Sequence, residues 1–252
     1  MTGDEPKSRR LDQVLVDAGH FASRTRAQGA IRQGHVAVDG RTVSKPGQLI
    51  APESEVSVSG DVHGFVSRAA LKLENGLDAF GFDPAGKTCL DLGASTGGFT
   101  QSLLNRGAAK VYAIDVGTGQ LHESLAGEER VINLEKTHAK TISDQNVPER
   151  VDAIVCDVSF ISLKKSLPFA LARASKIAFL VALIKPQFEL GPAFIGKGGL
   201  VTADDSQLGA LCGDMASWLE GLGWQVAGVI DSPIKGGDGN REFLIGAQRT
   251  SQ

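Results

Sequence analysis

Four ionisable side chains of this 252-residue chain have the types and positions that proton-transfer chemistry would need. Asp157 and Lys185 each follow directly on a run of apolar residues, as side chains at the ends of buried strands do. Glu242 follows a glycine-rich stretch and opens the last apolar run, and Lys72 lies in a helix-forming segment. One charged residue at a strand end is often only a solvated terminus, but several that converge favour a catalytic site. A lysine amine among such groups could take the proton of a weakly acidic hydroxyl.

Alternating strands and helices are predicted to bring these side chains together. The predicted strands are residues 88–92, 110–115, 130–134, 151–157, 177–184, 225–231 and 242–247, and the predicted helices are residues 65–73, 99–106, 119–126, 162–173 and 205–222. Such alternation predicts a Rossmann-like α/β fold with a mostly parallel sheet, whose ligands bind beyond the carboxyl ends of the strands. Residues 232–240 join the last two strands without a helix, so the last strand is predicted to be antiparallel.

Residues 89–100 (CLDLGASTGGFT) have the pattern of a strand, a glycine turn and a helix. A dinucleotide site needs three glycines in this turn; Gly93 and Gly98 fit, but Ser95 stands at the middle position. Asp115 ends the next strand, 24 positions after Asp91, where a ribose-binding acid is expected. This combination favours S-adenosylmethionine over a nicotinamide cofactor. The candidate cofactor-binding residues are Asp91, Gly93, Ala94, Ser95, Thr96, Gly97, Gly98, Phe99, Asp115, Asn133 and Asp157.

A small basic domain is predicted at residues 9–60, before a catalytic domain at residues 65–248. Between residues 7 and 45 the chain holds eight basic and three acidic residues, a net charge of +5 in a protein of net charge -3. The predicted elements are a helix over residues 11–18 that stops at Gly19, a helix capped by Ser23 that ends at Gly34, a hairpin over residues 35–43 with Asp39-Gly40 as its turn and a strand over residues 55–59. Residues 60–64 are predicted to be a short hinge. The charge favours an anionic partner such as nucleic acid, although a solvated helix face would have the same composition.

The cysteines and the apolar runs point to a cytoplasmic protein. Cys89, Cys156 and Cys212 form no C-x-x-C pair and are expected to be structural thiols in a reducing compartment. The five histidines show no metal-ligand spacing, so no metal is predicted. The N-terminus lacks an apolar signal segment, and the longest apolar run, residues 177–184, is far shorter than the roughly 20 residues that cross a bilayer. No membrane partner is expected, and the oligomeric state stays open.

The basic domain contains a series of short motifs at fixed spacing. They are RLD at residues 10–12, Leu15, SRTRA at residues 23–27, Ile31, GHV at residues 34–36, VDG at residues 38–40 and PG at residues 46–47. This series resembles the S4 RNA-binding domain. The resemblance implies recognition of RNA shape and backbone, with ribosomal RNA or a ribosomal subunit as the partner. The arginines that it places on RNA phosphates are Arg9, Arg10, Arg24, Arg26 and Arg32.

The four ionisable residues of the catalytic domain occur in the order Lys72, Asp157, Lys185 and Glu242. This order resembles the K-D-K-E tetrad of the FtsJ-like ribose 2′-O-methyltransferases. The segments SRAALKL, DLGASTGGFT, CDVSFISL, LIKPQFE, GKGGLV and GGDGNREFL are similar to the TlyA group of S4-domain rRNA methyltransferases, long labelled hemolysin-like. The resemblance implies methylation of a cytidine 2′-hydroxyl in rRNA. Ala69-Ala70 and Gln101 depart from the group's pattern outside the tetrad, and the short flanks resemble a subgroup that favours large-subunit rRNA.

The tetrad implies a division of roles that fits the chemistry of a ribose hydroxyl, which must lose its proton as it attacks. Lys185 is the candidate base, and a lysine serves near neutral pH only where burial or a neighbouring cation, here Lys72, lowers its pKa. Asp157 would orient Lys185, and Glu242 would hold Lys72 or the hydroxyl. Attack on a sulfonium methyl disperses positive charge, so the site needs in-line positioning and no metal.

Three more residues are candidates for contacts with the cofactor or the RNA. Asn133 is predicted to flank the adenosine, Phe160 to pack on the target nucleotide or in the core, and Lys197 to meet a phosphate or lie in a surface turn. An rRNA methyltransferase is the first functional hypothesis. A ribosome-assembly factor with dispensable methyl transfer is the second. A membrane-lysing protein is disfavoured because no spanning or strongly amphipathic apolar segment occurs.

Overall fold

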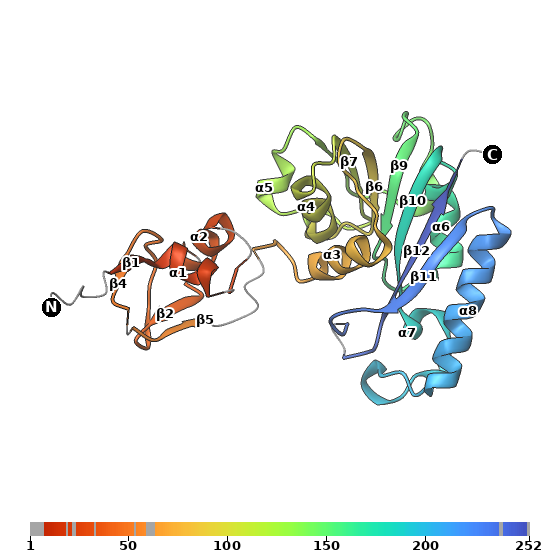
Figure 1. Cartoon of the computed structure of the whole chain (residues 1–252). Coiled ribbons are helices and arrows are strands. Elements are labelled where there is room, and N and C mark those ends of the chain that lie inside the picture. The colour runs from red at the N-terminus through yellow and green to blue at the C-terminus, as the bar shows by residue number, and fades with distance from the viewer. Residues whose placement is uncertain are drawn as a thin grey trace, which may run out of the picture. The chain divides into compact units, whose positions relative to one another are not determined.

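The protein is described by a computed structural model in which the chain forms two compact units, Met1–Arg68 and Ala69–Gln252 (Figure 1). The residues that the structure describes are 8–18, 20–21, 24–32, 34–52, 54–58, 64–236 and 239–250. Gly19, Ser23 and residues 60–63, for which a helix stop, a helix cap and a hinge were predicted, lie outside these ranges, as does the side chain of Arg26.

The first unit packs two helices on small antiparallel sheets. Its elements are β1 (Arg9–Arg10), α1 (Leu11–Asp17), α2 (Arg24–Arg32), β2 (Val36–Val38), β3 (Arg41–Thr42), β4 (Leu49–Ile50) and β5 (Val56–Val58). Strand β2 pairs with β3 and β5, and β1 pairs with β4. Asp39 and Gly40 both have positive φ, as the predicted two-residue hairpin turn requires. Leu11, Leu15 and Ile31 are fully buried and form the centre of this small core.

The second unit is a three-layer α/β structure. Its helices are α3 (Ala69–Phe80), α4 (Gly98–Asn105), α5 (Glu123–Ala126), α6 (Leu163–Leu171), α7 (Pro186–Glu189) and α8 (Asp205–Gly221). Its strands are β6 (Thr88–Leu92), β7 (Lys110–Ile114), β8 (Val131–Leu134), β9 (Val151–Cys156), β10 (Ala174–Ile184), β11 (Gln225–Asp231) and β12 (Phe243–Arg249). Three short 3-10 helices, Ala139–Thr141, Pro192–Phe194 and Lys197–Gly199, complete the described elements.

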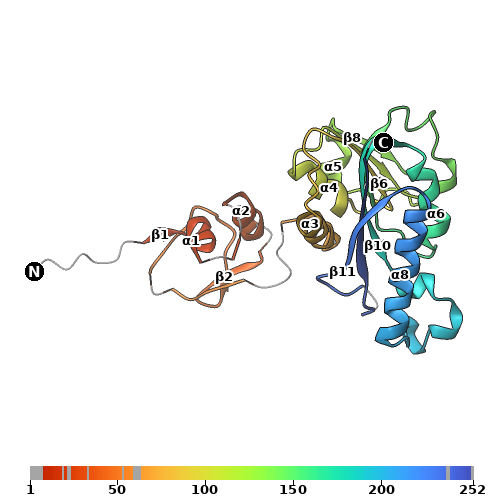
Figure 2. The same cartoon turned by 45° about the vertical axis from the view of Figure 1, so that its right-hand side comes forward.

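The seven strands lie in the order β11-β12-β10-β9-β6-β7-β8. Pairing is parallel from β10 to β8, and β12 runs antiparallel to both of its neighbours. The predicted fold class, a Rossmann-like sheet with an antiparallel last strand plus a small N-terminal α+β domain, is therefore confirmed. Helices α3 and α4 cover one face of the sheet and α6 and α8 cover the other, as Figures 1 and 2 show from two directions.

Close packing fixes α3 against the sheet. A side chain at Gly246 of β12 would collide with the ring of Phe80, and one at Gly76 would come within 3.0 Å of Val181 in β10. The missing side chains let the helix backbone approach the strands, so Lys72, one turn into α3, is held at a set distance from β12.

Two predicted helices begin later than expected. The helix predicted over residues 65–73 starts at Ala69 and continues to Phe80. The helix predicted over residues 119–126 is only the single turn Glu123–Ala126. Its expected first turn is not helical: Gly119 has a positive φ of +64°, and the Glu135 carboxylate accepts the N–H groups of residues 119–121, which ties this loop to the end of β8.

Candidate active site

The order and register of the strands bring the four predicted ionisable residues to one edge of the sheet. Ile184 pairs with Phe243, so Lys185 and Glu242 stand next to each other where β10 ends and β12 begins. Leu92 pairs with Cys156, so Asp157 lies beside the glycine turn that follows β6. Parallel strands end at the same edge, and an antiparallel strand begins there, which brings Asp157, Lys185 and Glu242 together. Lys72 reaches the same edge from α3.

Lys72 and Glu242 form a buried ion pair. Lys72 Nζ donates to Glu242 Oε2 at 2.6 Å, and the two side chains are 9% and 3% exposed. A side chain at Gly236 would collide with the second carboxylate oxygen of Glu242, so the glycine-rich loop before β12 closes over this pair. Removing either partner would leave the other as a buried, uncompensated charge.

Lys185 is held by one ion pair and one hydrogen bond. Its Nζ lies 2.6 Å from Asp157 Oδ1 and donates to Ser159 Oγ at 2.9 Å. The Lys185 and Asp157 side chains are 10% and 14% exposed, so the pair is nearly buried but open at one side. Ser159 did not emerge from sequence reasoning as a functional residue, although it lies within the quoted CDVSFISL segment.

The glycine turn between β6 and α4 places backbone close to Asp157. Gly93 has φ +86°, and a Cβ there would lie 2.7 Å from the carbonyl oxygen of Asp157. Ser95, at the position where a dinucleotide site has glycine, also adopts a positive φ of +48°. Asp115, at the end of β7, accepts the N–H of Ser95 at 2.8 Å and that of Gly117 at 2.7 Å, so one carboxylate fixes both loops.

A cavity of about 330 Å³ opens between these loops. It is lined by Leu92, Gly93, Ser95, Ile114, Asp115, Val116, Gln120, Thr137, His138, Ala139, Asp157, Val158, Ser159, Phe160, Ile161 and Ser166. Four of the predicted cofactor-binding residues, Gly93, Ser95, Asp115 and Asp157, are in this lining. The described lining contains two carboxylates and no lysine or arginine, which disfavours a pyrophosphate and suits a cationic ligand.

The remaining cofactor candidates do not contribute to the described lining. Ala94, Thr96, Gly97, Gly98 and Phe99 form the turn and the start of α4 behind it. Asn133 lies on β8, and the residues that line the cavity on that side are instead Thr137, His138 and Ala139. Sequence reasoning missed these three because the segment after β8 shows no strand or helix periodicity.

Asp91 is fully buried and precedes Leu92 and Gly93, two residues that line the cavity. Its Oδ2 accepts the hydroxyl of Thr100 at 2.7 Å, whereas its Oδ1 has no hydrogen-bond donor among the described residues. Burial raises the pKa of Asp91 to about 7, and repulsion from Asp157 adds to the shift. A buried carboxylate with one unsatisfied oxygen is suited to a cationic partner.

Phe160 lies at the mouth of the cavity and does not belong to the core. Its side chain is 90% exposed, its φ is +66°, and its ring centroid lies 5.1 Å from that of Phe188. Of its two predicted roles, packing in the core is wrong, and packing on the target nucleotide stays a prediction. Lys197 lies in the short 3-10 helix Lys197–Gly199, and its two predicted roles both stay open.

The predicted RNA-binding arginines belong to the first unit. Arg9 and Arg10 form the exposed strand β1, and Arg24 and Arg32 are the first and last residues of α2, both exposed. Arg26 lies between them in the same helix. All five therefore come from two elements, β1 and α2, which both contact α1.

Comparison with known proteins identifies both units. The family described as FtsJ-like methyltransferase matches residues 65–249, and the S4 domain matches residues 9–56. The chain belongs to the FtsJ-like methyltransferase family. This FtsJ-like methyltransferase is 44% identical to the 16S/23S rRNA (cytidine-2'-O)-methyltransferase TlyA of Mycobacterium tuberculosis over 94% of this chain and 88% of the relative. The predicted resemblance to the FtsJ-like and TlyA groups is confirmed.

Other relatives of this FtsJ-like methyltransferase carry hemolysin names. It is 39% identical to Hemolysin A of Brachyspira hyodysenteriae over 93% of this chain and 98% of that protein. A solved structure from Streptococcus thermophilus, also described as a hemolysin, superposes with a TM-score of 0.72 at 35% identity and covers 97% of this chain and 90% of its own. Among the helices that the structure describes, none has the length and apolar character to cross a membrane.

Proposed function

We propose that this FtsJ-like methyltransferase transfers a methyl group from S-adenosylmethionine to the 2′-hydroxyl of a cytidine in ribosomal RNA. The observation that carries the proposal is Lys185, whose amine is held by Asp157 and Ser159 at the edge of a cavity with acidic lining. The name of the mycobacterial relative supports the choice of cytidine and rRNA. We assign RNA binding to residues 9–60 and catalysis to residues 65–248, and an rRNA substrate implies a cytoplasmic enzyme.

The cavity suits S-adenosylmethionine by charge and shape. Asp115 stands where it can accept the ribose hydroxyls of an adenosine, and the Gly93 backbone leaves space along one wall. The unsatisfied Oδ1 of Asp91 is the acceptor we assign to the ammonium group of the methionyl end. When bound, the donor supplies a methyl group on a positively charged sulfur. The described lining has two carboxylates and no lysine or arginine, so it is compatible with that positive charge.

The geometry around Lys185 suits a general base. A neutral amine has two N–H groups and one lone pair. Asp157 and Ser159 can take the two N–H groups, which leaves the lone pair for the ribose hydroxyl. In the proposed step the 2′-oxygen forms a bond to the methyl carbon, its proton passes to Lys185 Nζ, and the carbon–sulfur bond breaks. Lys72 and Glu242 form the side of the site that faces the substrate, and the exposed ring of Phe160 stacks on the target nucleotide.

The first prediction concerns Asp115. Asp115→Asn should weaken S-adenosylmethionine binding about 10- to 100-fold, because a hydrogen bond to a charged acceptor contributes about 1.5–3 kcal/mol. Titration calorimetry would measure the affinity. A donor analogue without ribose hydroxyls should bind the wild type and the variant equally. If the variant loses affinity for that analogue as well, Asp115 acts only by fixing the loops at Ser95 and Gly117.

The second prediction is a pH dependence caused by Asp91. Because an ammonium group binds the ionised carboxylate, donor affinity should rise about tenfold per pH unit up to pH 7, the raised pKa of Asp91, and then level off. The same shift means that the ligand-free fold should lose stability as pH rises from about 4 to about 7, because the folded state keeps the proton that the unfolded chain releases. Asp91→Asn should remove both effects, whereas Asp115→Asn should keep the slope. Equal slopes in wild type and Asp91→Asn would exclude this role.

The function itself is tested by mapping 2′-O-methyl groups in 16S and 23S rRNA from cells with and without the protein. At least one cytidine should lose its methyl group when the protein is absent and regain it when purified enzyme, donor and ribosomal subunits are combined. An unchanged map, with growth or assembly defects only, would favour the assembly-factor hypothesis and contradict the proposal.

A further inference from the structure

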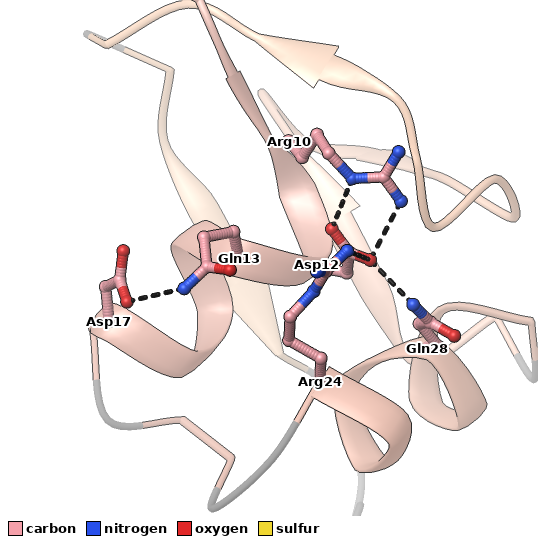
Figure 3. Close-up of polar contacts among 6 residues, drawn as sticks. All are labelled: Arg10, Asp12, Gln13, Asp17, Arg24 and Gln28. Atoms are coloured by element: carbon pink, nitrogen blue, oxygen red, sulfur yellow. Dashed lines mark hydrogen bonds and ion pairs between the residues drawn. The ribbon is translucent and has the colours of Figure 1, made fainter.

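Asp12 is a fully buried carboxylate in the most basic part of the chain. It lies in the first turn of α1 and receives four hydrogen bonds. Arg10 Nε donates to Oδ1 at 3.0 Å, and Oδ2 accepts from Arg10 Nη2 at 3.0 Å, Arg24 Nη2 at 2.9 Å and Gln28 Nε2 at 2.7 Å (Figure 3). One side chain therefore joins β1, α1 and α2 at a single point.

The two arginines remain open to a ligand although they share this acceptor. Their side chains are 49% and 48% exposed. A guanidinium group has five N–H donors, and Asp12 takes two from Arg10 and one from Arg24. Both Nη2 atoms lie within 3.0 Å of the same oxygen, so they are less than 6 Å apart. Two guanidinium groups at that separation can contact one phosphate group from two sides.

The charge of this cluster also fits one phosphate. Two arginines and one carboxylate leave a single positive charge, which equals the charge of one backbone phosphate. The hydrogen bond from Arg10 holds the pKa of the Asp12 carboxyl well below its usual range, so the carboxylate stays ionised at every pH at which RNA is stable. Arg10 also packs against Gly47, where a Cβ would lie 3.0 Å from its Nη1. The loop before β4 therefore limits the movement of the Arg10 guanidinium on the side away from Asp12.

We propose that Asp12 is a positioning residue that holds Arg10 and Arg24 together as a clamp for one phosphate of the RNA substrate. The inference rests on the proposed function, because it assumes that the first unit binds RNA. It adds that an acidic residue is needed for that binding. The clamp reads the backbone and not the bases, so it contributes affinity and orientation for any RNA of suitable shape.

The sign of one substitution separates this role from simple electrostatics. Asp12→Asn removes a negative charge close to the RNA, so charge alone would tighten binding. Loss of the clamp would weaken binding, because the two arginines would no longer share an ionised acceptor. Asp17 provides a matched control: it lies in the same helix, is 42% exposed and pairs with Arg9. It also accepts a hydrogen bond from Gln13 on the solvent side (Figure 3).

The experiment measures binding of purified 23S rRNA to the full-length protein over a series of salt concentrations. We expect Asp12→Asn to weaken binding about tenfold and to lower the salt slope by about one, as the loss of one phosphate contact does. Asp17→Asn should leave affinity unchanged or raise it. In a background of Arg10→Ala with Arg24→Ala, Asp12→Asn should cause no further loss, because a positioning residue acts only through the groups that it positions.

A second variant keeps the test decisive if Asp12→Asn disturbs folding. Gly47→Val changes no charge and leaves Asp12 in place, but its side chain would displace the Arg10 guanidinium. We expect several-fold weaker RNA binding with amide exchange in α1 and α2 like that of the wild type. Wild-type affinity for Gly47→Val, or tighter binding by folded Asp12→Asn, would overturn the clamp. Absence of salt-dependent RNA binding by the wild type would instead overturn the proposed function.

Discussion

Replacing Lys185 with alanine should lower the single-turnover rate of methyl transfer by about 10²- to 10⁴-fold, the usual contribution of a general base. Lys185→Arg should be equally impaired, because a guanidinium group cannot give up its proton in this pH range. Donor and RNA binding should persist in both variants, since Lys185 does not line the described cavity and lies outside the S4 unit. Quenched-flow transfer of a labelled methyl group to rRNA would measure the rate.

Ser159→Ala is the matched control for Lys185. It removes the hydrogen-bond acceptor of the Lys185 amine and leaves the ion pair with Asp157 in place. We expect a smaller loss, about tenfold, because the base is present but less well oriented. A near wild-type rate for Lys185→Arg would exclude proton abstraction by Lys185. The four residues would then act by electrostatic positioning of the hydroxyl.

The edge of the sheet where the site lies could be predicted because the sequence shows where each strand ends. Asp157 and Lys185 directly follow apolar runs, and the absence of a helix between the last two strands indicated an antiparallel last strand that begins at the ligand-binding edge. That it begins beside Lys185 is a result of the strand register. These strands are recognisable from local patterns of alternating or continuous apolar residues. The topology rules of α/β sheets then predict that the residues at the strand ends lie close together.

The pairing of the tetrad could not be predicted in the same way. The sequence left Glu242 with two possible partners, and the contact with Lys72 depends on how closely α3 packs on β12. The position of Ser159 depends on the conformation of the backbone that follows β9. There Phe160 has a positive φ, which no sequence pattern predicts. The missing helix turn before Glu123 has the same origin, because Gly119 has a positive φ and the distant Glu135 holds the N–H groups of this loop.

The basic unit shows a related limit. Its helices and hairpin could be read from apolar spacing and the Asp39-Gly40 turn, but β1 and β4 are two residues long and carry no periodic signal. Asp12 was visible only as part of a motif. Its burial and its shared contacts with Arg10 and Arg24 arise from the packing of α1 on α2, which residue types do not specify.

The buried pair of Lys72 and Glu242 gives the second large effect. Lys72→Met or Glu242→Gln alone should destabilise the catalytic unit by about 3–5 kcal/mol, because each leaves an uncompensated buried charge. For a unit of this size that corresponds to a fall in melting temperature of roughly 6–20 °C, measurable by calorimetry. Asp78→Asn is the control. Asp78 lies on α3, as Lys72 does, and is an exposed ion-pair partner of Arg106, so its replacement should lower the free energy of unfolding by less than about 1 kcal/mol.

The double variant Lys72→Met with Glu242→Leu separates stability from catalysis. Replacing both charges with apolar groups of similar volume should return most of the stability, since neither charge then remains buried alone. Methyl transfer should stay at least 100-fold below the wild-type rate, because no cation and no carboxylate then face the hydroxyl. If activity returns together with stability, the pair only joins α3 to β12, and Lys185 with Asp157 and Ser159 must carry the chemistry without it.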